Sequence, residues 1–188
     1  LDHASRIAAG DWLGGEAFYL APLYPYALAS VMALTGTSGE AALGPILAFQ
    51  SLLSTLAVLL IGALAARLGG WRTGLVAAAL AAVFEPFVYQ SSIAMPTSLI
   101  LCAHLVALWL VVRTSGMETD PERRSQPPTA AWLLTGLALA LAVLSHGTGL
   151  AVAAALLVWL VLRPGSSGVR RRLVVAALVV GGLVPPLA

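Results

Sequence analysis

The sequence contains no lysine, one cysteine and few charged residues of either sign. Its 188 residues include ten arginines and eight acidic residues, so charged residues make up only 10% of the chain, whereas hydrophobic residues make up 60%. Soluble domains usually carry about 25% charged residues. The mean hydropathy of +0.94 therefore excludes an ordinary soluble domain and indicates an integral membrane protein. The net charge of +2 is too small to indicate a nucleic-acid partner.

The single cysteine and the two ends of the sequence set further bounds. Cys102 cannot form an intrachain disulfide, and one cysteine excludes a cysteine-rich metal site. The sequence begins with Leu1 rather than methionine and stops in or just after an apolar run. We therefore expect it to be a fragment of a longer chain.

Apolar runs occupy most of the chain after residue 40. A membrane-spanning helix needs about 20 apolar residues, and the candidate runs are 42–66, 73–92, 96–112, 130–145, 149–162 and 173–188. The sequence therefore predicts an all-α fold, a polytopic transmembrane helical bundle with about six spans over residues 41–188. The fourth and fifth runs predict a tight helical hairpin, with one long kinked helix as the alternative.

The arginines predict the orientation of these spans. Nine of the ten follow the first, third and fifth runs. Because consecutive spans alternate in direction, these three loops share one side, and the positive-inside rule makes that side cytoplasmic. The polar, proline-rich segment 114–129 is then a cytoplasmic linker, and residues 1–40 form an extracytoplasmic loop.

The predicted outer loop contains two candidate interface helices. Residues 2–9 predict a short helix that ends at Gly10. Residues 22–36 are apolar, but a helix of this length spans about 22 Å, less than the ~30 Å hydrocarbon core. We predict that this second helix lies in the outer interface, with Tyr24 and Tyr26 at headgroup depth. The alternative is that it crosses the membrane.

Several motifs in the loop and the helices carry a family resemblance. They are Ala8-Ala9-Gly10-Asp11-Trp12-Leu13, Pro22-Leu23-Tyr24-Pro25-Tyr26, Gln50-Ser51-Leu52-Leu53 and Phe84-Glu85-Pro86-Phe87-Val88-Tyr89. The chain resembles bacterial relatives of the protein O-mannosyltransferases and of the lipid A aminoarabinose transferases. These are membrane glycosyltransferases of the GT-C fold, so the resemblance implies a GT-C-like bundle.

The resemblance also implies a mechanism and a location. Such enzymes are multi-pass proteins of the bacterial inner (plasma) membrane, with the active site facing the periplasm or exterior. They take a sugar from a polyprenyl-phosphate carrier and transfer it to a hydroxyl group of a protein, lipid or glycan acceptor. An outer-loop aspartate deprotonates that hydroxyl. A cationic contact or a divalent metal ion steadies the departing phosphate.

The resemblance carries over to individual residues only in part. The family's main catalytic aspartate is expected just before Leu1, so Asp2 is either the catalytic base or its neighbour. Ala21 stands where relatives carry lysine or histidine, so one expected phosphate contact is absent. The residues predicted to bind substrate are Arg6, Asp11, Tyr24, Glu85 and His146.

Three ionisable residues also have structural interpretations. Glu85 lies in the second apolar run, where an acid usually faces protein or water. It is a second acid, a metal ligand or a structural partner, for example protonated against Gln50. His146, in an outer turn, either contacts a phosphate or is a polar turn residue. For His104, within the third run, we predict a neutral ring bonded to a neighbouring helix.

Two other classes of protein compete with the glycosyltransferase interpretation. A transporter subunit would use ionisable residues and broken helices near the midplane, often in two related halves. Glu85-Pro86 fits such a site, but the sequence contains no second half that matches the first. A non-catalytic membrane scaffold is the other alternative. The long outer loop with its carboxylates favours the glycosyltransferase.

Overall fold

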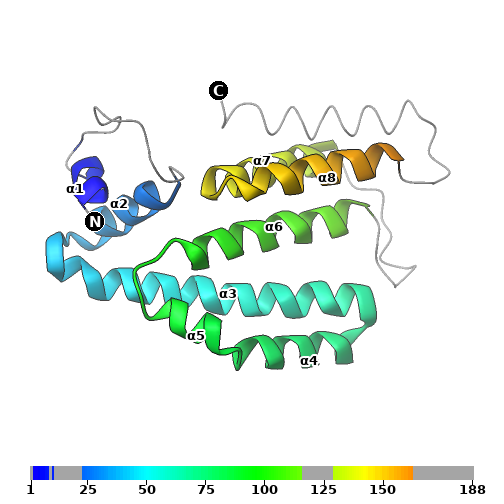
Figure 1. Cartoon of the computed structure of the whole chain (residues 1–188), viewed down its shortest axis with the longest axis horizontal. Coiled ribbons are helices and arrows are strands. Elements are labelled where there is room, and N and C mark those ends of the chain that lie inside the picture. Colours follow the sequence, from blue (N-terminus) through cyan, green and yellow to red (C-terminus); the bar gives the residue numbers. More distant parts are fainter. Residues whose placement is uncertain (1, 9, 11–22, 116–128, 163–188) are drawn as a thin grey trace.

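The computed structural model describes residues 2–8, 10, 23–115 and 129–162, which form a set of packed helices (Figure 1). The regular elements in these residues are α1 (Asp2–Ala8), α2 (Leu23–Thr35), the 3-10 helix η1 (Gly39–Ala42), α3 (Leu43–Gly69), α4 (Trp71–Ala82), α5 (Glu85–Ser91), α6 (Thr97–Ser115), α7 (Thr129–Ser145) and α8 (Thr148–Leu162). The all-α prediction is confirmed. The sixth predicted run, 173–188, lies outside the described residues.

The long helices lie side by side along the longest axis of the molecule (Figure 1). Helix α3 contacts α4, α5 and α6, α6 packs on α7, and α7 packs on α8. Two helical stretches, Gly39–Gly69 and Thr97–Thr114, are long and apolar enough to cross a membrane. Helices α2, α7 and α8 are apolar but shorter.

The two ends of this bundle differ in chemistry. The end at the left of Figure 1 carries α1, α2, the start of α3, the start of α6 and the α7–α8 turn. We call this the α1–α2 end. The opposite end carries the α3–α4 turn and the end of α6, and with them Arg67, Arg72 and Arg113. These arginines therefore share one end, as the alternation of spans predicts. The side of the membrane that this end faces stays a prediction.

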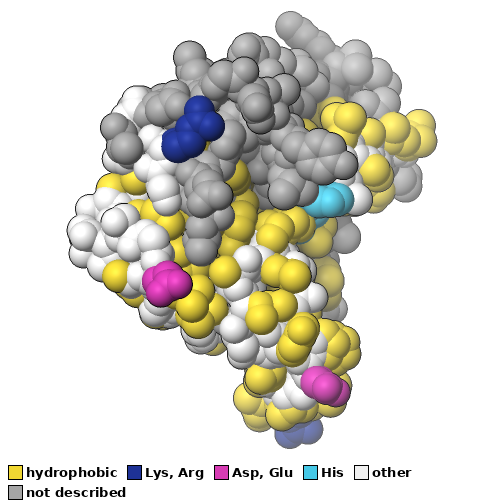
Figure 2. Space-filling model, turned by 60° about the vertical axis from the view of Figure 1, so that its left-hand side comes forward, with side chains coloured by type: hydrophobic (Ala, Val, Ile, Leu, Met, Phe, Trp, Pro, Cys, Tyr) yellow, Lys and Arg dark blue, Asp and Glu magenta, His cyan; other side chains and the backbone are white. Residues whose placement is uncertain are grey.

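The outer surface of the bundle is largely apolar. Figure 2 shows hydrophobic side chains over much of one face, with only isolated charged groups between them. On α3 and α4, Leu52, Leu59, Leu75 and Leu80 are each more than 60% exposed. Contiguous exposed leucine is rare on water-soluble proteins but is the ordinary surface of a helix facing lipid.

The candidate span 73–92 is not one continuous helix, and its crossing of the membrane stays a prediction. Helix α4 ends at Ala82, Phe84 is extended with φ −71° and ψ 107°, and α5 begins at Glu85. Pro86 explains the break, since it has no N–H to donate to Ala82 O and its ring clashes with that carbonyl in a helix.

The prediction of a tight hairpin over 130–162 is confirmed. Helices α7 and α8 are separate and pack against each other, joined by His146 and Gly147. Gly149 allows this close approach, because a Cβ atom there would lie 2.6 Å from the backbone of Ala142. One long kinked helix is thereby excluded.

Candidate functional site

Helices α1 and α2 are fixed to the start of α3 by a small apolar core. Its buried members are Ala4, Ile7, Leu28, Ala29, Met32, Ala42 and Ile46. Helix α1 forms as predicted, and Gly10 ends it in a left-handed conformation (φ 103°) with its N–H donating to Ile7 O at 3.0 Å. The apolar side of α1 thus rests on α2, and the polar residues of α1 are held at this end of the bundle.

A buried glutamine joins three elements at the α1–α2 end. Gln50 of α3 is completely buried, and its Nε2 donates to Tyr24 Oη of α2 at 2.9 Å and to Met95 O at 2.7 Å. Because the Met95 carbonyl can only accept, Nε2 must face it, which fixes the orientation of the amide. The Gln50 Oε1 has no partner among the described residues. An unpartnered buried carbonyl is costly and is suited to a hydroxyl or N–H donor.

Tyr24 retains a hydroxyl proton that it can donate. Its Oη accepts from Gln50, so the O–H itself is free of that bond. Burial raises the pKa of Tyr24 above the ordinary value of 10.0, and the Gln50 hydrogen bond opposes this only partly. The phenol therefore stays protonated at neutral pH and can act as a hydrogen-bond donor to an anionic group.

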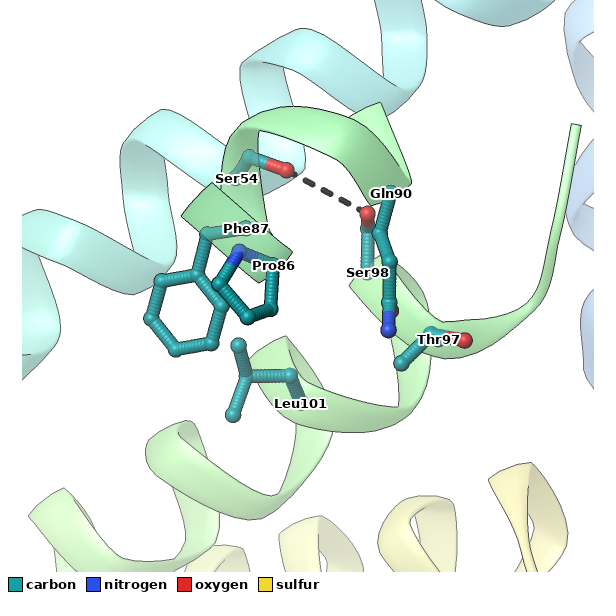
Figure 3. Close-up of a pocket in the computed structure, with 7 residues that line it drawn as sticks. All are labelled: Ser54, Pro86, Phe87, Gln90, Thr97, Ser98 and Leu101. Atoms are coloured by element: carbon teal, nitrogen blue, oxygen red, sulfur yellow. Dashed lines mark hydrogen bonds between the residues drawn. The ribbon is translucent and has the colours of Figure 1, made fainter. Parts of the chain in front are cut away.

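A cavity of about 100 Å³ lies next to this network, between α3, α5 and α6. Figure 3 shows its lining residues: Ser54, Pro86, Phe87, Gln90, Thr97, Ser98 and Leu101. The Ser54 and Ser98 hydroxyls lie 3.2 Å apart within hydrogen-bonding distance. Ser54 is one helical turn from Gln50, so both polar side chains lie on the same face of α3. The lining offers neutral hydroxyl and amide groups beside an aromatic ring.

His146 lies in the α7–α8 turn and is exposed. Its Nδ1 accepts from the Thr148 N–H at 3.2 Å and lies 3.0 Å from Thr148 Oγ1. Because a backbone N–H can only donate, Nδ1 carries no proton in this arrangement, and the proton of the neutral ring is on Nε2. His146 is thus a turn residue whose Nε2–H remains able to donate. His146 can therefore be a polar turn residue and still contact a phosphate through its Nε2–H.

The remaining candidates of the outer loop are placed only in part. Arg6 is exposed in the last turn of α1. Asp2 begins the same helix, but its side chain lies outside the described part of the structure, as does the whole of Asp11. The roles predicted for these two carboxylates therefore stay predictions.

Two predicted side-chain partnerships are wrong. Glu85 does not pair with Gln50, because it is exposed at the start of α5 while Gln50 bonds Tyr24 and Met95. Among the described residues, His104 is hydrogen-bonded within its own helix, where its Nδ1 lies 2.8 Å from Ile100 O, and not to a neighbouring helix.

A divalent metal ion does not fit the described side chains. In the helices that the structure describes, histidine, cysteine, aspartate and glutamate do not gather in groups of three or more. Hard divalent cations need several oxygen ligands at one point. The prediction of a divalent metal ion, to which no ligands were assigned beyond Glu85 as one candidate, therefore stays a prediction.

Of this polar group, the sequence analysis named Gln50, which lies beside the cavity, but not the cavity residues Ser54, Gln90, Thr97 and Ser98. Gln50 and Ser54 follow each other at helical spacing within an apolar run, which marks a polar stripe facing the bundle interior. That signal is readable from the sequence. The facing residues Thr97 and Ser98 could not be paired with them, because the pairing depends on how α6 packs against α3.

Comparison with known proteins gives one finding. Residues 20–187 match the family model described as dolichyl-phosphate-mannose-protein mannosyltransferase. No curated protein and no solved structure matches the chain. The matched range covers α2 to α8 and leaves out α1.

Proposed function

Since the chain belongs to the dolichyl-phosphate-mannose-protein mannosyltransferase family, we propose that it transfers a sugar from a polyprenyl-phosphate carrier to an acceptor hydroxyl. The family is one of membrane glycosyltransferases. The proposal adds the lipid-phosphate donor and the α1–α2 end, on the extracytoplasmic face, as the place of transfer. A protein, lipid or glycan supplies the hydroxyl.

The observation that carries the proposal is the hydrogen bond from Gln50 Nε2 to Tyr24 Oη. It holds a protonated phenol at the end of the bundle that lacks the clustered arginines. His146 Nε2–H and the Arg6 guanidinium belong to the same end. Neutral and cationic donors of this kind stabilise the negative charge that develops on a leaving phosphate.

The reaction is a displacement at the anomeric carbon. A carboxylate of the outer loop accepts the proton of the acceptor hydroxyl, and Asp2 is the candidate within this sequence. The hydroxyl oxygen then forms the new bond to the anomeric carbon. The bond from that carbon to the phosphate oxygen breaks, and polyprenyl phosphate leaves with the electron pair. Tyr24 and His146 donate to the phosphate oxygens as their charge rises.

The test is a transfer assay with the complete protein in membranes and a polyprenyl-phosphate-mannose donor. We expect release of polyprenyl phosphate, and we expect Tyr24→Phe to lower kcat/KM by about tenfold to a hundredfold. A hydrogen bond to a charged group contributes about 1.5–3 kcal/mol, and each 1.36 kcal/mol is tenfold in rate.

Tyr26→Phe is the matched control, because Tyr26 lies on the same helix but does not bond Gln50. We expect it to leave kcat/KM within about twofold. If Tyr24→Phe and Tyr26→Phe lower kcat/KM equally, Tyr24 does not contact the substrate. No release from mannose, glucose or aminoarabinose donors would contradict the proposed function itself.

A further inference from the structure

The cavity between α3, α5 and α6 has two sides of different chemistry. Figure 3 shows Pro86, Phe87 and Leu101 on one side of it. The other side carries the polar side chains Ser54, Gln90, Thr97 and Ser98. A polar wall that faces an aromatic and aliphatic wall suits a molecule with both hydroxyl groups and an apolar C–H face.

Two of the polar side chains are available to a bound molecule. The Ser54 and Ser98 hydroxyls lie 3.2 Å apart and bond each other. The Gln90 amide and the Thr97 hydroxyl are half-buried, and in the part of the chain that the structure describes they have no hydrogen-bond partner. Such groups cost free energy when they are shielded from water without a partner. A ligand that carries hydroxyl groups would satisfy both of them.

The helix break before α5 places side chains in the cavity wall. Phe87 and Gln90 are three residues apart on α5 and therefore lie on the same face of that helix. The Phe87 ring is steadied by the edge-to-face contact with Phe84, whose centroid lies 5.2 Å away at an interplanar angle of 87°. Irregular backbone within a membrane bundle is tolerated where it is packed in protein or lines a polar cavity. The break thus belongs to the construction of this cavity.

The cavity adjoins the candidate site through Gln50. That residue bonds Tyr24 and Met95, and Thr97 follows Met95 by two residues. Ser54 lies four residues beyond Gln50, a rise of about 6 Å along α3. A molecule whose phosphate reaches Tyr24 can therefore extend its sugar to the cavity. The volume of about 100 Å³ is below the roughly 300–1,000 Å³ of pockets that enclose drug-sized ligands, so only one edge of a sugar ring enters.

We propose that this cavity receives the hydroxyl-bearing edge of the donor sugar and selects a neutral sugar over an amino sugar, with Gln90 and Thr97 as the specificity-determining residues. This inference rests on the proposed function. The described residues that line the cavity include no charged side chain. An ammonium group placed there would lose water without gaining a counter-charge. A neutral sugar instead bonds Gln90 and Thr97 through its hydroxyls and packs its C–H face on Phe87.

The test compares donors with the complete protein in membranes. A neutral donor, polyprenyl-phosphate mannose or glucose, is set against polyprenyl-phosphate aminoarabinose. We expect the wild type to favour the neutral donor by at least about tenfold in kcat/KM. Thr97→Val is expected to lower kcat/KM for the neutral donor by about threefold to tenfold, the usual effect of one neutral hydrogen bond. The control is Thr55→Val, because the exposed Thr55 hydroxyl bonds Ser51 O of its own helix, and it should stay within about twofold.

Gln90→Glu tests the selection itself. The carboxylate keeps the size of the amide and supplies a counter-charge, so the ratio of aminoarabinose to neutral-sugar transfer is expected to rise by about tenfold. Equal thermal midpoints in detergent exclude a folding defect, and if Gln90→Glu is less stable, Thr97→Val decides. Release of polyprenyl phosphate from none of the donors would contradict the proposed function. Release with Thr97→Val equal to Thr55→Val, an unchanged ratio in a stable Gln90→Glu, or a wild type that prefers aminoarabinose would overturn the role of the cavity alone.

Discussion

At the level of single residues, Gln50 is the buried polar side chain that links three segments of the α1–α2 end. It connects α2, α3 and the segment before α6 through two hydrogen bonds, and it is fully buried. Removing a buried partner costs more than the bond contributes, because the groups left behind lose water as well. The contacts of Gln50 therefore bear on both the stability of this end and the position of Tyr24.

We predict that Gln50→Leu lowers the free energy of unfolding by about 1–3 kcal/mol. The change leaves Tyr24 Oη and Met95 O without their donor, although it also removes the unpartnered Oε1. Unfolding in detergent measures the effect, with Ser51→Ala as the control, because the exposed Ser51 hydroxyl bonds only its own helix at Leu47 O. Equal stability of Q50L and wild type would contradict the role assigned to the amide.

The sequence predicts Tyr24 as a substrate contact but not its partner. Tyr24 was singled out by its motif and its place in the outer loop. Gln50 lies 26 residues further on, and nothing local in the sequence pairs the two. The contact arises from the docking of α2 on α3, which is a property of the packed bundle. The pairing of Glu85 with Gln50, one of the alternatives considered for Glu85, fails for the same reason.

Among the helices, glycine permits a close contact between α3 and α4. A Cβ atom on Gly74 would lie 2.6 Å from Ala66 Cβ and 2.6 Å from Gly62 O. Such small-residue interfaces let helix backbones approach closely in membranes, where lipid provides no hydrophobic drive between helices. The α3–α4 hairpin therefore depends on Gly74 having no side chain.

Gly74→Ala is predicted to destabilise the protein by about 1–3 kcal/mol, because the new methyl group overlaps backbone that cannot move aside. The better helix propensity of alanine, about 1 kcal/mol, offsets only part of this. Gly44→Ala is the control, since a Cβ atom on Gly44 meets nothing within 4 Å. It is expected to be neutral or slightly stabilising in the same unfolding assay. If Gly74→Ala stabilises the protein instead, helices α3 and α4 lie further apart than in the structure.

Hydropathy predicts the helices of this bundle better than it predicts their breaks. The α7–α8 hairpin was readable because a short polar turn separates two apolar runs. The α4–α5 break was not, because Phe84 and Pro86 are apolar and extend the run without a gap. A hydropathy profile scores how apolar each side chain is. The helix break results instead from the backbone, because proline has no N–H.

For the molecule as a whole, sugar transfer at the α1–α2 end requires the two ends of the bundle to face opposite sides of the membrane. Ser38 and Trp71 are exposed near opposite ends of the Gly39–Gly69 helical stretch. In a Cys102→Ala background, we predict that an impermeant maleimide applied to intact cells labels Ser38→Cys. Trp71→Cys should react only after the membrane is permeabilised. Trp71 lies at the arginine end of the bundle, and the positive-inside rule places that end in the cytoplasm. Labelling of Trp71→Cys in intact cells would invert the topology.

Photocrosslinking can locate the binding site of the lipid-linked sugar, which we propose to lie at the α1–α2 end. The complete protein is irradiated with a polyprenyl-phosphate sugar that carries a diazirine on its first isoprene unit, and the labelled peptides are mapped. If the lipid-linked sugar binds at this end, residues 23–35, 93–98 and 146–148 will be labelled, and unlabelled donor will suppress the labelling. Label confined to residues 67–72 and 109–113, at the arginine end, would contradict it.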